Sequence, residues 1–249
     1  MTRVWTYLAA GLVCLCATPA AAAGQTPQAP PPPPPHVEGT GELSFVTTSG
    51  NSQTDTIGLG GSLIYRPSPW VIDSKVAFVR TAANDVVNAR ALTAVSRLSR
   101  DLTPRLALFA QYDFLNSPFA GISQRHTIVG GVSYKAIDHA QQTLHVDGGV
   151  GYSSETPVGL PRTNTATVLG GVGYKWKISD TSDFTEDARI VESLSHGDDW
   201  RFDNAAALTA KVTTRLSLKL SHLTHVVNLP TPGFKKTDTI ASAALVAKF

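Results

Sequence analysis

Residues 106–114 read Leu-Ala-Leu-Phe-Ala-Gln-Tyr-Asp-Phe, and this stretch decides the fold class. Every second position is apolar or aromatic, and the positions between are mixed or polar. Successive side chains of a β-strand point to opposite faces, so a repeat of two residues predicts a strand with one apolar face. In a transmembrane barrel that face contacts lipid, and the polar face lines a wet lumen.

The same alternation returns along the chain, and no apolar run from residue 38 onward reaches the roughly 18 residues of a membrane helix. The pattern predicts an all-β, antiparallel up-and-down transmembrane β-barrel of about 12 strands. An even strand number places both chain ends on the periplasmic side. The expected strands are residues 39–48, 54–66, 70–81, 87–99, 105–115, 124–135, 143–153, 164–176, 182–193, 201–212, 214–226 and 237–249.

The expected connections alternate in length. Short turns are expected at residues 67–69, 101–104, 136–142, 177–181 and 213. Longer connections are expected at residues 49–53, 82–86, 116–123, 154–163, 194–200 and 227–236. Short turns of such barrels face the periplasm and long loops face the exterior.

Aromatic residues close several of these segments. A Gly-Gly-Val-x-Tyr pattern occurs at residues 130–134, 148–152 and 170–174. Rings at strand ends suit the membrane interface, which predicts one aromatic girdle. Its expected members are Tyr65, Trp70, Tyr134, Tyr152, Tyr174 and Trp176. The alternative is ordinary aromatic packing in a soluble, lipid-binding β-sandwich.

The N-terminal region predicts export. Arg3 precedes an apolar run from Val4 to Cys16 and then small residues, which indicates a signal peptide over residues 1–23. A membrane anchor is the alternative, but this run falls short of the roughly 20 residues that a spanning helix needs. Residues 24–37 are expected to form a proline-rich periplasmic linker, and residues 38–249 the outer-membrane barrel of a Gram-negative cell.

The composition limits the partners. The net charge is +2 and basic residues are scattered, so no nucleic-acid partner is expected. Both cysteines, Cys14 and Cys16, lie in the expected leader. The last strand ends on the aromatic Phe249, a feature that the barrel-assembly machinery favours. The expected partners are therefore outer-membrane lipid, lipopolysaccharide and that machinery.

Residues 116–138, with Pro118-Phe119-Ala120-Gly121 and Arg125, and the turn Thr48-Ser49-Gly50-Asn51 resemble a known family. The chain is similar, over about residues 38–249, to the salt-induced outer-membrane proteins, the domain of unknown function 481. The resemblance implies an outer-membrane barrel, and it implies no catalytic residues. The proline-rich segment is not part of the family pattern.

The predicted inner face carries charges of both signs, which indicates a weakly selective lumen. The expected lumen-lining residues are Asp73, Lys75, Arg90, Gln111, Asp113, Lys135, His145, Asp147, Lys175, Asp187, Arg189 and Lys211. Pro118, Phe119, Gly121 and Arg125 are expected to form a constricting loop. The leading hypothesis is a passive channel or an envelope-integrity component that responds to osmotic conditions.

An outer-membrane enzyme acting on lipid or lipopolysaccharide is the alternative. Ser123, His126 and either Asp113 or Asp138 form the nearest hydrolase set, but Ser123 and His126 point to opposite faces of a strand. His222 and His225 differ in parity in the same way, which counts against a metal site with His196, Asp198 and Asp199. No catalytic, metal or cofactor site is expected.

Overall fold

The computed structural model describes residues 35–48, 54–195 and 197–249. They form twelve strands and one short 3-10 helix, η1, Pro118–Ala120. The strands are β1 (Val37–Thr48), β2 (Thr54–Tyr65), β3 (Trp70–Ala83), β4 (Val86–Asp101), β5 (Leu106–Ser117), β6 (Ile122–Asp138), β7 (Gln142–Pro157), β8 (Thr163–Lys177), β9 (Ser182–Ser193), β10 (Trp200–Lys211), β11 (Leu216–Val227) and β12 (Thr237–Lys248).

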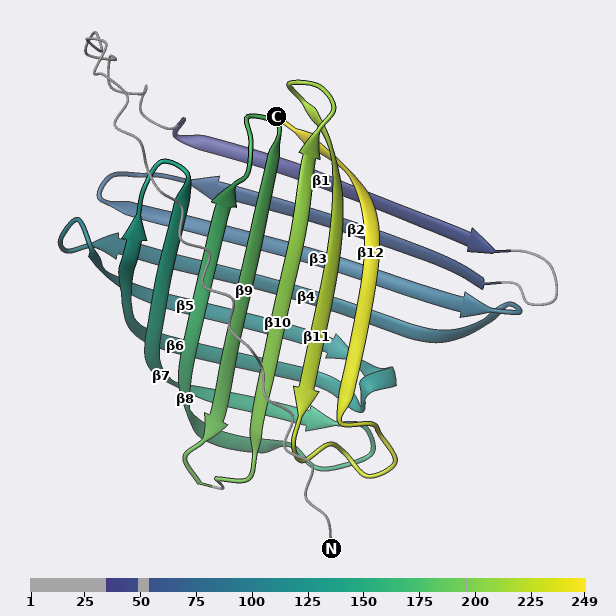
Figure 1. Ribbon diagram of the computed structural model, residues 1–249. Coiled ribbons are helices and arrows are strands. Elements are labelled where there is room, and N and C mark those ends of the chain that lie inside the picture. Colours follow the sequence, from purple (N-terminus) through teal and green to yellow (C-terminus); the bar gives the residue numbers. More distant parts are fainter. Residues whose placement is uncertain (1–34, 49–53, 196) are drawn as a thin grey trace, which may run out of the picture. The chain divides into compact units, whose positions relative to one another are not determined.

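Each strand pairs antiparallel with the next, and β1 pairs with β12 to close the barrel (Figure 1). The predicted fold class and strand number are confirmed. The expected signal peptide and the linker up to residue 34 lie outside the described residues. Among the described residues, no helix is long and apolar enough to cross a membrane.

The connections give the barrel two different ends. Residues 66–69, 102–105, 139–141, 178–181 and 212–215 form the short-turn end, where β1 also begins and β12 ends. The other end, called the long-loop end, has residues 84–85, 118–121, 158–162, 194–199 and 228–236. The expected alternation in length holds for residues 158–162, 194–199 and 228–236, which are longer than the three or four residues of the short turns. Residues 118–121 are no longer than those turns, and residues 49–53 lie outside the described residues. The connection of β3 and β4 also departs from it. Residues 82–86 are a two-residue hairpin, because Asn84 and Asp85 adopt positive φ angles of 48° and 63°, the conformation of a tight turn.

Two short turns share one local mechanism. The sequence Thr-x-Arg-Leu occurs at residues 103–106 and again at residues 213–216. In the first turn the Thr103 hydroxyl accepts hydrogen bonds from the backbone N–H groups of Arg105 and Leu106, at 3.3 and 2.9 Å. Thr213 does the same for its turn. A threonine hydroxyl thus stands in for a backbone acceptor where the chain reverses.

Contacts between strands that are not neighbours identify the inner face. Arg97 on β4 binds Asp147 on β7 at 2.6 Å, and Lys219 on β11 binds Glu42 on β1 at 2.8 Å. Side chains of separated strands meet in this way only across the barrel interior. The repeat of two residues then assigns every other position. On β5, Gln111 and Asp113 point inward and Leu108 and Tyr112 outward, as the sequence predicts.

One half of the interior is packed. Phe109, Val129, Leu169 and Val191, which point inward from β5, β6, β8 and β9, form a buried apolar cluster. Inward glycines beside it let the sheet bend sharply. A Cβ at Gly131 would lie 2.7 Å from the Cα of Gly149 and 2.9 Å from the Phe109 ring. Glycine is therefore required there by close backbone approach.

The aromatic residues form two belts instead of one. Tyr65, Trp70, Tyr134, Tyr174 and Trp176 lie near the short-turn end. Tyr152 does not join them, because β7 runs the opposite way from β6 and β8. It pairs with Ile128, which in turn pairs with Tyr112, toward the long-loop end. The single girdle expected from sequence was wrong in this respect.

The closing seam between β1 and β12 is short. The two strands pair only from Thr40–Lys248 to Leu43–Leu245, whereas β11 and β12 pair along nearly their whole length. At the short-turn end, Gly39 and Phe249 exchange two backbone hydrogen bonds of 3.1 Å. The Phe249 ring lies over Gly39, where a side chain would collide with it. The terminal residue thus completes the ring of strands.

Candidate functional site

The barrel interior is the candidate site, and an Arg97–Asp147 pair spans its packed half. Two nitrogens of the guanidinium donate to the two Asp147 oxygens at 2.6 and 3.2 Å. The same guanidinium lies 3.8 Å from the centre of the Phe109 ring. A two-pronged ion pair over an aromatic face fixes an arginine firmly. Arg97 therefore links the charged lining to the apolar cluster.

A second group is centred on Arg189 of β9. Its guanidinium binds Asp113 at 2.9 Å and Asp203 at 2.8 Å. Asp113 also accepts a hydrogen bond of 3.0 Å from the Gln111 amide, and His225 pairs with Asp203. The group joins β5, β9, β10 and β11, so it crosses the interior in the half toward the long-loop end.

A third group lies closer to the long-loop end. Glu155 accepts hydrogen bonds from Arg125 at 2.6 Å and from Arg201 at 3.1 Å. The side chains of Arg125 and Arg201 are only 9% and 11% exposed, so both guanidiniums depend on the shared carboxylate. Arg201 also donates to the Ser153 hydroxyl. Arg125, expected in the loop, therefore belongs to the inner face of β6.

The other half of the interior is open. Small side chains occur on the inner faces of β1–β3, β11 and β12, among them Thr40, Ser62, Ala77, Ser221 and Ser242. They lie on the same faces as the Lys219–Glu42 pair and as larger apolar residues such as Leu223. Ala77 is exposed although it points inward from the middle of β3. Lys75 beside it is 61% exposed, and its ammonium lies 3.7 Å from Asp73. The inner surface thus combines a filled side with an accessible side.

The predicted lumen residues lie on the inner face with one exception. Asp73, Lys75, Gln111, Asp113, Lys135, His145, Asp147, Lys175, Asp187, Arg189 and Lys211 have inward register positions. Arg90 has an outward position. It lies on the same strand as the inward Arg97 but an odd number of residues away, and its register partner is Arg80. Period two therefore turns Arg90 outward, near the rim, where a long side chain reaches polar headgroups.

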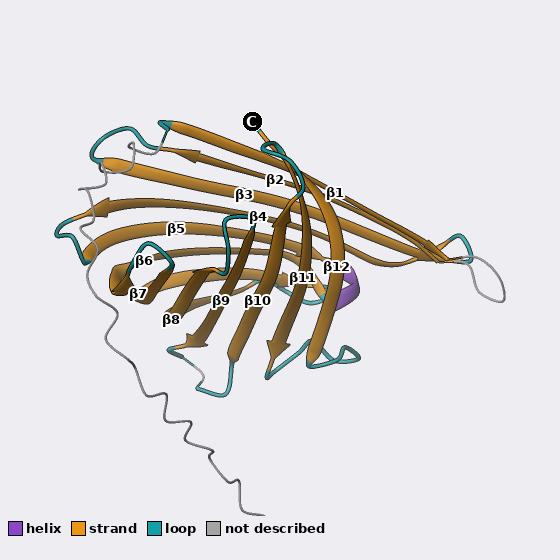
Figure 2. Ribbon diagram, turned by 45° about the horizontal axis from the view of Figure 1, so that its top comes forward, coloured by secondary structure: helices purple, strands orange, loops and turns teal. Residues whose placement is uncertain are grey.

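The expected constricting loop reaches across the mouth. Pro118 and Phe119 lie in η1, and Gly121 ends it with a left-handed φ of 80°. The Gly121 carbonyl accepts a hydrogen bond of 3.2 Å from the Thr231 hydroxyl, and Phe234 packs close to the glycine. Figure 2 shows η1 beside the loop that joins β11 and β12. The two loops come from distant parts of the strand order, so they meet over the long-loop end.

The hydrolase set is not assembled. His126 points outward, where its Nδ1 lies 2.9 Å from the Tyr112 hydroxyl and its ring contacts Phe114. Asp113 points inward and Asp138 lies at the far end of β6. His222 and His225 likewise face opposite sides, and His196 lies outside the described residues. Within residues 35–48, 54–195 and 197–249, no cluster of three potential metal ligands occurs.

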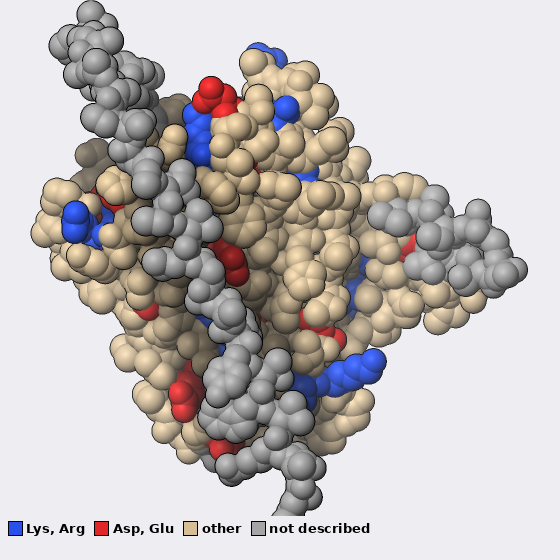
Figure 3. All heavy atoms as spheres, viewed as in Figure 1, with Lys and Arg blue, Asp and Glu red and all other residues tan. Residues whose placement is uncertain are grey.

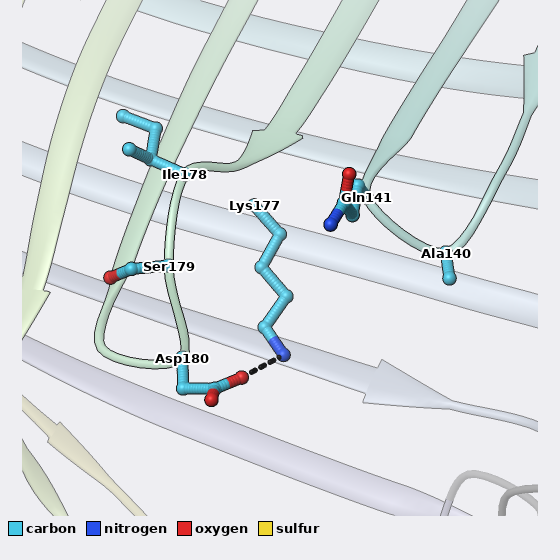
Figure 4. A pocket seen from close by; sticks show the side chains of 6 residues that line it. All are labelled: Ala140, Gln141, Lys177, Ile178, Ser179 and Asp180. Carbon is cyan, nitrogen blue, oxygen red and sulfur yellow. Dashed lines mark hydrogen bonds and ion pairs between the residues drawn. The ribbon is translucent and has the colours of Figure 1, made fainter. Parts of the chain in front are cut away.

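A shallow pocket of about 370 Å³ lies between two short turns (Figure 4). Lys177 binds Asp180 there at 2.8 Å, and this contact holds the pKa of Asp180 below its usual value. The Asp180 side chain is 97% exposed, so the pair has little energetic weight. The pocket is a feature of the turns and has no catalytic set.

Sequence reasoning missed several interior residues. Arg97, Glu155, Arg201, Asp203, His225, Lys219 and Glu42 all take part in the inner ion pairs. Some of them could have been found from the alternation of side chains along a strand. Arg201 and Asp203 lie an even number of residues from Lys211, so they share its inner face. Which charge meets which depends on contacts across the lumen, and alternation along one strand does not contain that information.

Comparison with known proteins agrees with this architecture. Residues 41–249 match the family described as "Protein of unknown function, DUF481". No curated protein gives a significant match. Among solved structures, the COG4313 outer membrane channel from Pseudomonas putida F1 is similar at a TM-score of 0.52 and 10% identity, covering 86% of this chain and 95% of that one.

Two porins are also similar in structure. The NanC porin has a TM-score of 0.46 and 7% identity, with 85% of this chain and 97% of that chain covered. The KdgM porin has a TM-score of 0.43 and 8% identity, with 85% and 99% covered. At these identities the likeness concerns the fold. That fold is a closed antiparallel β-barrel.

Proposed function

This chain belongs to the DUF481 family, and we propose that it is a narrow passive channel for small hydrophilic solutes. The observation that carries the proposal is the uneven interior. Ion pairs and an apolar cluster fill the side of β5–β9, while small residues and the exposed Lys75 line the opposite side. Solutes would pass along the accessible side.

The charges of the interior imply weak selectivity. Asp113, Asp147, Asp203 and Glu155 all have arginine partners at 3.1 Å or less. Paired charges cancel much of their field, whereas a ring of one sign would favour one sign of ion. Lys75, whose ammonium lies 3.7 Å from Asp73, is a weakly compensated inner cation. We expect a small preference for anions.

The contact of Gly121 with Thr231 and Phe234 gives the proposed channel a cover at its long-loop end. A loop contact over the mouth limits the size of permeating solutes without blocking water. Conductance should therefore be small for a barrel of twelve strands.

The test is the conductance of the purified protein in planar lipid bilayers. We expect reproducible steps and a small reversal potential across a salt gradient. The replacement of Lys75 by glutamine should shift that potential toward cation preference, because it removes an exposed inward charge. Folded protein that gives no steps, with an established porin conducting in the same bilayers, would exclude a channel.

The remaining expectations complete this proposal. A leader over residues 1–23 would direct export, and the Phe249 end would engage the barrel-assembly machinery, with lipid and lipopolysaccharide around the mature barrel. A channel of this kind suits a role in osmotic response or envelope integrity. N-terminal sequencing of protein from outer membranes would test cleavage after Ala23.

A further inference from the structure

Polar side chains gather on the outer face of the barrel at mid-strand. Glu186 on β9, Ala206 on β10 and His222 on β11 are register partners in one row, and each lies in the middle third of its strand. Asn204 and Thr224 form the adjacent outward pair. The lipid-facing centre of a barrel is normally apolar. We call the four polar residues Glu186, Asn204, His222 and Thr224 the polar row.

The polar row is not satisfied within one copy. The Asn204 amide donates to the Glu186 carboxylate at 2.9 Å, and a neutral amide cannot compensate the charge. His222 is exposed and makes no hydrogen bond to another described residue. One strand separates Glu186 from His222, a spacing of about 10 Å, so they do not pair directly. Ionisable groups that face hydrocarbon are costly and usually indicate a contact or a function.

The other outward polar groups of this barrel differ. Ser74 and Ser96 are neutral and bind each other at 2.9 Å, and His126 lies near the long-loop end beside the Tyr112 hydroxyl. The side chains around the polar row are also small, so this part of the outer surface is flat. Its outward neighbours are Ala188, Ala206, Ala241 and Ala243. Small residues allow two membrane segments to approach closely.

A second, independent observation concerns the neighbouring edge. Among the described residues, β12 pairs with β1 only at residues 245–248, and none of them pairs with the β1-facing edge of β12 over residues 237–244. Unpaired backbone groups at membrane depth need protein or water to satisfy them. The polar row and this edge adjoin on the face formed by β9–β12. Figure 3 shows acidic side chains on this face among largely uncharged surface.

We propose that the outer face of β9–β12 binds a second copy of this chain in a two-fold dimer. Both copies insert with the same end outward, so the axis is perpendicular to the membrane. An axis beside Ala206 places Glu186 of one copy opposite the partner's His222, and the reverse contact forms as well. The face is thus self-complementary, because an imidazole N–H can donate to a carboxylate oxygen. This inference does not depend on whether the barrel conducts.

Disulfide crosslinking tests the position of the axis. The full chain with Cys14 and Cys16 replaced by serine has no other cysteine. Ala206→Cys is introduced in this background, and Ala94→Cys, which also points outward at mid-strand but on β4, is the matched control. In phosphatidylcholine–phosphatidylglycerol vesicles with copper phenanthroline and dioxygen, we expect about tenfold more covalent dimer from Ala206→Cys. Equal yields, or no dimer from either variant, would overturn the proposal.

A charge exchange tests the pairing. Glu186→His and His222→Glu each place like groups opposite one another and should lower the dimer fraction about tenfold, and the double variant should restore it. The dimer fraction is measured by sedimentation in detergent, and the heat-modified gel shift confirms that each barrel is folded. A folded double variant that stays monomeric would contradict the Glu186–His222 contact.

Discussion

At the scale of single residues, the glycines of β6 and β7 differ sharply in what surrounds them. The inward Gly131 lies against the backbone of β7, whereas nothing lies within 4 Å of the position that a side chain at the outward Gly148 would occupy. The alternation of side chains explains the difference. The inner face, which holds Gly131, is compressed by the bend of the sheet, and the outer face, which holds Gly148, is expanded. The Gly-Gly pairs at residues 130–131 and 148–149 therefore each contain one required glycine and one replaceable glycine.

We expect Gly131→Ala to lower the free energy of unfolding by about 2 kcal/mol, because the new methyl group overpacks the bend. Gly148→Ala should change the free energy of unfolding by no more than about 1 kcal/mol in either direction. Alanine has room at this position and restricts the unfolded chain, which offsets any loss. Urea unfolding followed by tryptophan fluorescence measures both. Equal losses would show that the inner bend is not the constraint.

The carboxylate of Glu155 gives a second prediction at this scale. Glu155→Gln leaves the guanidiniums of Arg125 and Arg201 near one another without their shared anion. Because both are nearly buried, we expect a loss of about 3 kcal/mol in the same unfolding measurement. Asp180→Asn removes an exposed carboxylate at the short-turn end and should cause no measurable change. A tolerated Glu155→Gln would mean that water screens this group.

At the scale of elements, the strands were predictable and their contacts were not. Alternation such as that of residues 106–114 located all twelve strands, and both faces of β5 were predicted correctly. Arg90 and Tyr152 were misplaced for one shared reason. The alternation of a sequence shows that a strand has two faces. Which face points inward, and toward which end of the barrel the strand runs, is fixed only when the sheet closes. Contacts across the lumen, such as Arg97 with Asp147, are likewise set by closure.

The loop contact over the mouth belongs to this scale as well. Phe234→Ala removes the ring that packs against Gly121, so η1 should move more freely and single-channel conductance should rise. Leu194→Ala is the matched control, because Leu194 is 63% exposed in another connection of the long-loop end and should leave conductance unchanged. Planar bilayers measure both. An unchanged Phe234→Ala conductance would show that this contact does not limit the mouth.

At the scale of the whole barrel, the inner and outer surfaces follow different rules. The inner surface is stabilised by ion pairs between distant strands, which hold one half closed and leave the other accessible. The outer surface is largely apolar, and the polar row on β9–β11 places ionisable groups at mid-strand beside the incompletely paired seam. One chain thus combines a proposed path for solutes with a proposed contact for a second copy, on separate surfaces.

The central claim is that solutes pass along the accessible side of the interior, and thiol modification during conductance tests it most directly. Ala77→Cys points inward and Val76→Cys, the adjacent residue, points outward on β3. Both are made with Cys14 and Cys16 replaced by serine. A charged, water-soluble methanethiosulfonate should reduce the conductance of Ala77→Cys and leave Val76→Cys unchanged. Conductance that persists in Ala77→Cys after mass spectrometry confirms its modification would contradict the proposed path.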